Sequence, residues 1–129
     1  MNEIEYRRER HRQQRLERLG PNPQCLFCPE SDPGCLEQHH LGGRKFGDDC
    51  VIVCRNDHRK LTDKQKEHPS IAPERPTTPF ECLGRLLLGI ADALELLKVP
   101  QQLVLLIRDA ALHLIEIGPD FPATRGEQP

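Results

Sequence analysis

The sequence predicts an α+β fold in which a small module of two strands and a helix is preceded by a polar helix and followed by a helical hairpin. Three observations lead to this prediction. Two short β-prone segments, residues 35–41 and 50–54, flank the turn-rich stretch "GGRKFGDD". A segment of helix-forming composition, residues 56–68, comes directly after them. Leucines then recur at helical spacing between proline-marked boundaries in the last third of the chain.

Length and composition predict one domain with appendages. The chain has 129 residues, of which 36% are hydrophobic, and contains no tryptophan. It begins without the apolar stretch of a secretory signal, and its apolar runs fall far below the roughly 18 residues of a membrane helix. We therefore expect a soluble, cytoplasmic protein with no membrane partner. In a reducing compartment, six cysteines that include a C-x-x-C pair favour metal ligands over disulfides.

Charge is unevenly distributed along the chain, although the net charge is only −2. Residues 1–19 carry six arginines against four glutamates, and residues 44–66 carry seven basic residues against four aspartates. Residues 70–129 reverse the balance, with five basic residues against eight acidic ones. A phosphate backbone could therefore meet the N-terminal half of the chain while the acidic half points away.

The N-terminal segment, residues 1–20, is expected to form a basic helix, because residues 3–19 contain neither glycine nor proline. A solvated helix and a helix that contacts DNA explain this composition equally well. Three ion pairs at helical spacing should stabilise it, namely Glu3 with Arg7, Glu5 with Arg8 and Glu9 with Arg12.

The C-terminal segment predicts a helical hairpin over residues 79–118, after a proline-rich linker at residues 69–79 and before a flexible tail at 119–129. Thr78-Pro79-Phe80-Glu81 fits a capping box with proline at the first helical position, and a second helix should cover residues 101–117. The first apolar stripe comprises Leu83, Leu86, Leu87, Ile90, Leu94 and Leu97, and the second Leu103, Ile107, Ala110, Leu114 and Ile117. Further leucines, Leu88, Leu96, Leu105 and Leu112, exceed what one helix pair can bury. The hairpin should therefore cover the central module, form a homodimer through residues 80–117, or both.

The cysteines of the central module predict a structural zinc site. Cys25-Leu-Phe-Cys28 has the spacing of a zinc knuckle, and Cys54 begins a second pair of similar spacing that ends at Asp57. Because carboxylate oxygen is an accepted zinc ligand, three sulfurs and Asp57 could complete a tetrahedral site. Cys50 is the alternative fourth ligand, since it lies four residues before Cys54. A module of under fifty residues with few large apolar side chains is expected to need such a metal.

Three histidines predict a second metal site of a different kind. His39 and His40 lie on the first expected strand, and His58 lies near the start of the following helix. The order strand, loop, strand, helix would place His58 opposite the histidine pair. A histidine pair facing a helix-borne histidine, with acidic residues nearby in a basic module, is typical of a functional site.

The segment "EQHHLGGRKFGDDCVIVCRNDHRKLTDKQ", preceded by "CLFC", resembles the HNH endonuclease module of the ββα-metal, or His-Me finger, class. It is most similar to the zinc-stapled subgroup, whose second knuckle usually reads C-x-x-C-H. The resemblance covers residues 24–68. It implies that His39 is a ligand of a catalytic divalent ion, that His40 is the general base, and that His58 is a second ligand. The position of the family's middle asparagine is occupied by Asp49.

The resemblance implies a DNA endonuclease that hydrolyses phosphodiester bonds with a histidine base and one Mg²⁺ or other divalent ion. Two departures leave an alternative open: Thr62 stands where many members have another histidine, and Asp57 replaces the last thiolate of the second knuckle. The alternative is a catalytically inactive, zinc-stabilised module that binds DNA or protein. Five basic residues should hold the phosphate backbone with little sequence specificity: Arg44, Lys45, Arg55, Arg59 and Lys60.

Overall fold

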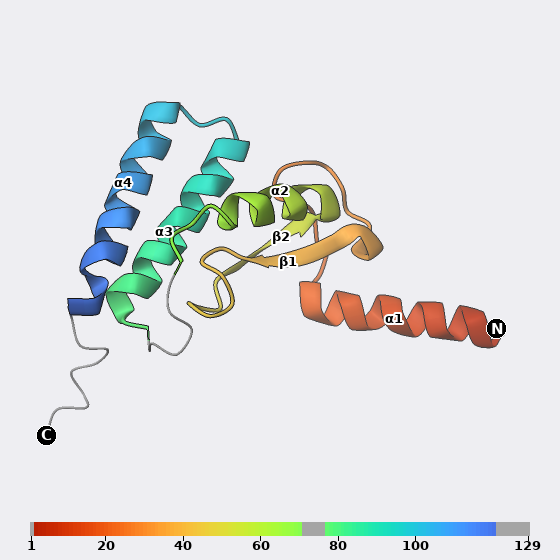
Figure 1. The fold of residues 1–129 in the computed structure, drawn as a ribbon. Coiled ribbons are helices and arrows are strands. Elements are labelled where there is room, and N and C mark those ends of the chain that lie inside the picture. Colours follow the sequence, from red (N-terminus) through yellow and green to blue (C-terminus); the bar gives the residue numbers. More distant parts are fainter. Residues whose placement is uncertain (1, 71–76, 121–129) are drawn as a thin grey trace, which may run out of the picture. The chain divides into compact units, whose positions relative to one another are not determined.

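A computed structural model describes residues 2–70 and 77–120, and within them the chain is a mixed α+β protein (Figure 1). The strands β1 and β2 pair as an antiparallel sheet, and helix α2 follows β2 directly. The order of two strands and a helix that the sequence predicts is therefore confirmed. The elements are α1 (Glu3–Leu19), η1 (Pro33–Cys35), β1 (Leu36–His40), β2 (Cys50–Cys54), α2 (Arg55–Gln65), α3 (Pro79–Leu96), α4 (Gln101–Ile117) and η2 (Gly118–Asp120).

The chain divides into two compact units, which we describe separately. Unit 1 comprises Met1–His39 and Val51–Arg59, and unit 2 comprises His40–Cys50 and Lys60–Pro129. Unit 1 therefore holds α1, η1, most of both strands and the first turn of α2. Unit 2 holds the loop between the strands, the rest of α2 and both helices of the hairpin. Part of the expected linker (residues 71–76) and most of the expected tail (residues 121–129) lie outside the described residues.

The start of α3 agrees with the capping signal in the sequence. The Thr78 side chain accepts a hydrogen bond from the Glu81 N–H at 3.3 Å, and Pro79 occupies the first helical position. The Thr78 hydroxyl also donates to the Gly118 carbonyl at 3.0 Å. This bond joins the start of α3 to the end of α4, so the same residue caps one helix and closes the open end of the hairpin.

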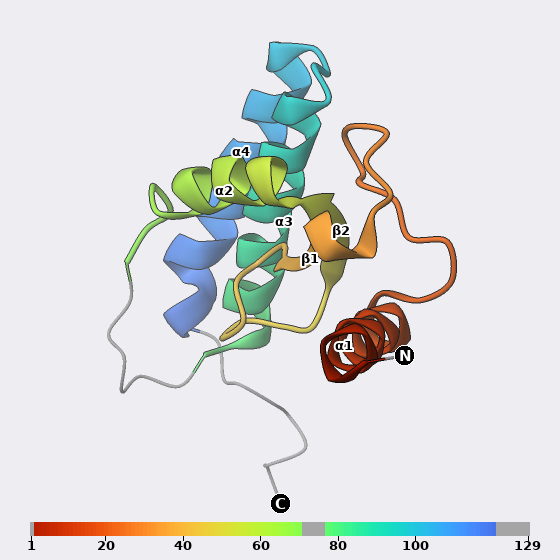
Figure 2. The same ribbon diagram turned by 90° about the vertical axis from the view of Figure 1, so that its right-hand side faces the viewer.

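Helices α3 and α4 lie side by side in unit 2, as both views of the ribbon show (Figures 1 and 2). They approach closely at Gly84, where an added Cβ would lie 2.7 Å from Ile115 Cγ1 and 2.8 Å from the Ala111 carbonyl oxygen. The buried face of α4 is accordingly Val104, Ala111 and Ile115. Within the expected stripe, Ile107, Leu114 and Ile117 are half-buried, but Leu103 and Ala110 are exposed. Their neighbours are buried instead, because α4 is apolar on nearly every side and close packing at Gly84 selects the residues that fit.

The hairpin also packs against the loop that follows β1. Gly89 of α3 contacts Leu41 so closely that an added Cβ would lie 1.7 Å from the Leu41 carbonyl oxygen. At Gly42 an added Cβ would lie 3.0 Å from the Leu86 backbone nitrogen. The hairpin therefore covers the part of the central module that belongs to unit 2, which is one of the two roles expected from its surplus leucines.

A network of charged side chains joins the end of α2 to the hairpin within unit 2. Arg108 donates to Asp92 at 3.0 Å and to Glu95 at 2.9 Å, Lys64 pairs with Glu95, and His68 Nε2 lies 2.8 Å from Asp92 Oδ2. Hydrogen bonds from Arg108 and then Lys64 lower the pKa of Glu95 to about 2. Two carboxylates on α3 therefore hold cations from α4 and from the end of α2.

Helix α1 forms over the expected residues, but only one of its three expected ion pairs is present. Arg7 donates to Glu3 at 2.7 Å, as predicted. Glu5 instead completes a capping box with Asn2 at the start of the helix, and Glu9 accepts from Gln13 at 2.9 Å. The backbone N–H groups at the start of a helix have no partner within the helix, so they bind the nearest acceptor. Because Glu5 accepts from the Asn2 N–H, it does not form the predicted ion pair with Arg8.

Candidate functional site

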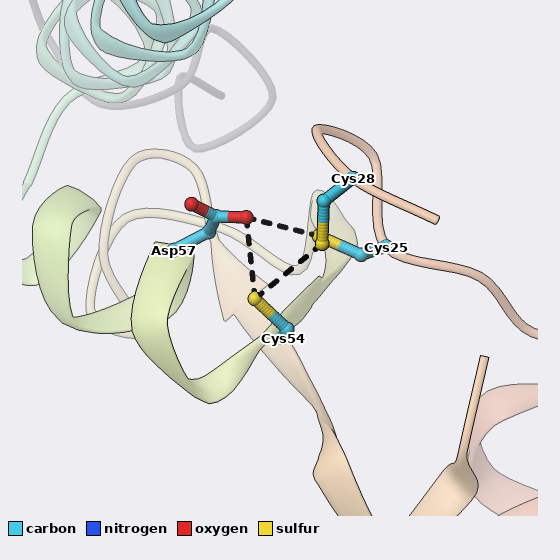
Figure 3. A group of neighbouring side chains, drawn as sticks. All are labelled: Cys25, Cys28, Cys54 and Asp57. Carbon is cyan, nitrogen blue, oxygen red and sulfur yellow. Dashed lines mark hydrogen bonds between the residues drawn. The ribbon is translucent and has the colours of Figure 1, made fainter. Parts of the chain in front are cut away.

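Four side chains of unit 1 converge into a group that could hold a metal ion: Cys25, Cys28, Cys54 and Asp57 (Figure 3). Their ligand atoms all lie within 4.8 Å of one another. The Asp57 Oδ2 atom lies 3.2 Å from the Sγ atoms of both Cys25 and Cys54, and the Cys28 and Cys54 sulfurs are 3.8 Å apart. Cys25 and Asp57 are buried, and the other two residues are half-buried. The predicted zinc ligands are thus brought together.

These separations fit a tetrahedral zinc ion. Ideal bonds of about 2.3 Å to sulfur and about 2.0 Å to oxygen place two sulfurs about 3.8 Å apart and a sulfur and an oxygen about 3.5 Å apart. The observed sulfur–sulfur distance of 3.8 Å matches, and the sulfur–oxygen distances of 3.2 Å are slightly shorter. A set of three thiolates and one carboxylate is chemically suited to Zn²⁺ and leaves no ligand position for water.

Local structure explains how the chain places these ligands. The Phe27 N–H points at the Cys25 sulfur at 3.5 Å, and the Cys25 N–H donates to the Glu30 carbonyl at 2.9 Å, which folds the first knuckle into a tight turn. The Leu26 N–H donates to the Ile52 carbonyl at 3.0 Å and so fixes the knuckle to β2. Cys54 ends β2, and Asp57 lies in the first turn of α2, where the helix dipole favours negative charge.

Electrostatics of the group favour the protonated form of the Cys54 thiol when no cation is bound. Burial raises the pKa of the Cys54 thiol to about 12, although a hydrogen bond with the Asp57 backbone acts in the opposite direction. Hydrogen bonds with the Asp57 side chain and the other two cysteines raise it further. Without a cation, ionised sulfurs beside a buried carboxylate are therefore unfavourable. A divalent ion reverses this balance, because it deprotonates the thiols that coordinate it.

Cys50, the alternative fourth ligand, does not belong to this group. It lies in unit 2, its side chain is exposed, and its Sγ atom lies 3.2 Å from the Asp48 carbonyl oxygen. Of the two alternatives that the sequence leaves open, Asp57 is the one that the structure places among the cysteines.

The histidines of unit 1 form a second cluster beside this group. The rings of His39 and His58 meet edge to face, with centroids 5.3 Å apart and an interplanar angle of 70°. His39 is buried, whereas 29% of the His58 side chain is exposed. His58 of α2 therefore lies against His39 of β1, one member of the expected histidine pair. Among the described residues, no third ligand joins them in a group comparable to that of the cysteines.

Sequence reasoning missed Glu37, which is bonded to this cluster. Its Oε2 atom lies 2.5 Å from His58 Nδ1, and its Oε1 atom lies 3.4 Å from Arg55 Nε. Because side chains alternate along a strand, Glu37 and His39 point to the same side of β1. That period-two spacing was the signal that could have identified it. The contact fixes the orientation of the His58 ring and leaves Nε2 as the nitrogen that could bind an ion.

His40 and Asp49 both belong to unit 2. His40 is half-buried, and its carbonyl oxygen accepts hydrogen bonds from the Gln65 side chain at 3.1 Å and from the Gly43 N–H at 3.1 Å. Asp49 is exposed, and its carbonyl oxygen accepts from the Leu41 N–H at 2.9 Å. Backbone bonds thus hold both residues at the base of the loop between the strands.

The five basic residues expected to contact DNA are all exposed: Arg44, Lys45, Arg55, Arg59 and Lys60. Arg55 is the member that bonds to Glu37. Within the described ranges, no helix is both long and apolar enough to cross a bilayer. Comparisons with protein families, with curated proteins and with solved structures returned no match.

Proposed function

We propose that this protein is a metal-dependent endonuclease of the HNH type that hydrolyses phosphodiester bonds in DNA with little sequence specificity. The observation that carries the proposal is the edge contact between His39 on β1 and His58 on α2, in a strand–strand–helix module built beside a Cys₃Asp group. Glu37 supports it, because a carboxylate that orients one ring nitrogen is typical of functional histidines.

His40 is assigned as the general base. Near pH 7 a neutral imidazole can accept a proton from water while the water oxygen attacks phosphorus. The bond from phosphorus to the 3′ oxygen then breaks, and the leaving oxygen takes up a proton. Asp49 would orient His40 or bind the ion. The backbone bonds of His40 to Gln65 and Gly43 hold its main chain in place during this step.

The proposed catalytic ion is Mg²⁺ or another divalent cation, held by His39 and His58. Such an ion stabilises the negative charge that develops on the phosphoryl oxygens and on the departing oxygen. Two imidazoles in contact offer nitrogen donors of the kind that divalent transition metals favour. For this reason cleavage should be tested with Mn²⁺ and Ni²⁺ as well as with Mg²⁺.

Zinc in the Cys₃Asp group would have a structural role and no catalytic one. A closed site with four protein ligands has no open position for water, so it cannot activate a nucleophile. Cleavage should therefore depend on the ion at the histidines and not on the zinc. The exposed arginines and lysines of the module would hold the phosphate backbone.

The hairpin is proposed to pair with a second copy of the chain. Several leucines remain exposed on it, which we call the hairpin leucines: Leu83, Leu103, Leu105, Leu106 and Leu112. Between 42% and 66% of each is exposed. Exposed apolar side chains that gather into a patch mark protein–protein contacts.

The test is a plasmid-nicking assay on the purified protein with Mg²⁺, Mn²⁺ or Ni²⁺. His40→Ala should abolish cleavage and leave folding and DNA affinity nearly unchanged, because it removes a proton acceptor. His58→Ala should also inactivate, and excess divalent ion should restore part of the activity, because it removes a ligand. His113→Ala, at an exposed position on α4, is the matched control and should cleave normally.

The second candidate function is an inactive, zinc-stabilised module that binds DNA or protein. It is favoured by the absence of a third ligand beside His39 and His58 among the described residues, and by Thr62 at the position where the family often has one. A protein that shifts DNA without nicking it under any of the three metals would establish this function and exclude the nuclease.

A further inference from the structure

One side of α1 carries five basic side chains, which we call the arginine face: Arg8, His11, Arg12, Arg15 and Arg18. Their steps of three and four residues place them on one face, because a helix turns by about 100° per residue. All are exposed except Arg15, which is half-buried. At about 1.5 Å per residue, the face extends about 15 Å along the helix.

The glutamates of α1 do not neutralise this face. Glu3, Glu5 and Glu9 are bonded to Arg7, Asn2 and Gln13 respectively, none of which belongs to the arginine face. Glu17, the fourth glutamate, lines a further groove together with Arg12 but forms no ion pair with it among the described residues. Among the residues that the structure describes, no acidic side chain forms an ion pair with Arg8, Arg12 or Arg18. The guanidinium groups of Arg8, Arg12 and Arg18 therefore lie on one face of the helix without an acidic partner among the described residues.

The arginine face borders two grooves within unit 1, each of about 230 Å³. Arg8, His11, Arg12 and Arg15 line one of them, together with Asp32 and Gly34, while His11, Gln14, Arg15 and Arg18 line the other. The one carboxylate in these linings, that of Asp32, accepts from the Gly34 N–H at 2.9 Å and so caps η1.

The half-buried arginine attaches the face to the rest of unit 1. The Arg15 guanidinium donates to the Pro33 carbonyl oxygen at 3.5 Å, and α1 packs against η1. The remaining basic side chains are thus presented from a helix that is fixed at its C-terminal end, which lowers the entropy lost when they bind a ligand.

The chemistry of the face fits a row of phosphates better than a lipid surface. A helix that lies on a membrane needs an apolar face opposite its basic one. The apolar residues of α1 are Ile4, Tyr6, Leu16 and Leu19, and they do not form such a face because Leu19 is buried inside the unit. Guanidinium groups match phosphate geometry, and duplex DNA carries one charge per about 1.7 Å of axis, so about 15 Å of helix meets several phosphates.

We propose that the arginine face of α1 is a contact for the DNA phosphate backbone, in addition to the basic residues of the central module. The proposal rests on the DNA partner of the proposed function but not on cleavage. Its contacts are independent of sequence, so α1 raises affinity and positions the duplex without selecting a site. Each guanidinium that binds a phosphate should add about 0.9 to the magnitude of the salt slope, d log K/d log[salt].

The test compares two double variants of the full-length, zinc-loaded protein. Arg8→Gln/Arg12→Gln removes two charges from the arginine face, and Arg7→Gln/Arg10→Gln removes two charges from α1 outside both grooves. Glutamine has nearly the helix propensity of arginine, and circular dichroism checks that α1 persists in both. Binding of a labelled duplex is measured by fluorescence anisotropy across a series of salt concentrations, without added Mg²⁺.

The face variant should lose about 1.8 from its salt slope and roughly 10-fold to 100-fold in affinity at low salt, while the control should keep the slope of the wild type. An unchanged slope in the face variant, or an equal loss in both variants, would overturn the proposal. Binding to vesicles that contain phosphatidylserine, combined with no binding to DNA, would overturn it as well. Because nicking is measured separately, a protein that binds through α1 but never cuts would exclude the nuclease and leave this inference standing.

Discussion

Replacing Asp57 by alanine should release the structural metal and destabilise unit 1. The substitution leaves three sulfurs and opens the position that Asp57 Oδ2 occupies, 3.2 Å from the Sγ atoms of Cys25 and Cys54. Losing an outer-shell partner of a metal ligand typically costs roughly 10-fold to 100-fold in metal affinity. The loss of a direct ligand should therefore cost at least about 100-fold.

That loss should convert directly into stability, because a metal ion that binds only the folded state stabilises it by mass action. With zinc in excess, a 100-fold weaker site lowers the free energy of unfolding by about 2.7 kcal/mol. At about 4 °C or more per kcal/mol for a small domain, the Tm should fall by at least about 10 °C. Calorimetry of the zinc-loaded protein gives the Tm, and a colorimetric chelator gives the rate of zinc release.

Two further variants make the comparison decisive. Asp57→Cys should slow zinc release, because it supplies the fourth thiolate that tight structural sites prefer. Cys50→Ser is the control and should leave both zinc content and Tm unchanged, since Cys50 is exposed and lies outside the group. If Cys50→Ser released the metal while Asp57→Ala retained it, the assignment of the fourth ligand would be wrong.

Three other predictions concern unit 2. Gly89→Ala should destabilise the fold by about 1–3 kcal/mol in urea unfolding, because its Cβ would overlap the Leu41 carbonyl, whereas Gly47→Ala should have little effect because only ordinary contact lies near it. The folded pKa of Glu95, about 2, lies below its ordinary 4.5, so its contribution is present above about pH 4.5 and is lost as the pH falls toward 2. The Tm advantage of the wild type over Glu95→Gln should accordingly shrink between about pH 5 and pH 2, and a constant difference would contradict this role. Light scattering should report a dimer that Leu106→Ser weakens, and a wild-type monomer would refute pairing through the hairpin leucines.

Local signals explain why the elements could be predicted from the sequence. The cap at Thr78 and the proline after it define the start of α3 without reference to the rest of the chain. The knuckle spacing of Cys25 and Cys28, with Cys54 at the start of a second pair, identified three side chains that the fold brings together, and it left Asp57 and Cys50 as alternatives for the fourth. Each of these signals depends on neighbours within a few residues.

Features that depend on packing could not be predicted in the same way. Leu103 and Ala110 were wrongly predicted to lie on the buried side of α4, because the choice among many apolar residues is made by Gly84 on another helix. Arg108, which holds Asp92 and Glu95, carries no signal in its own segment that would reveal these partners. Likewise, the period-two spacing places Glu37 and His39 on one side of β1, but the bond of Glu37 to His58 requires α2 to be in place as well.

The adjacency of Asp57 and His58 connects the two candidate sites of unit 1. Asp57 belongs to the Cys₃Asp group, and the next residue in the first turn of α2 contacts His39 and is held by Glu37. A metal that fixes the Asp57 carboxylate therefore also fixes the start of the helix that carries the proposed ligand of the catalytic ion. Zinc loss should then reduce cleavage although zinc takes no part in the reaction, and restoring zinc to Asp57→Cys should restore both stability and cleavage together. If cleavage survived complete removal of zinc, the structural group and the histidine cluster would be independent, and the position of His58 would be fixed by Glu37 alone.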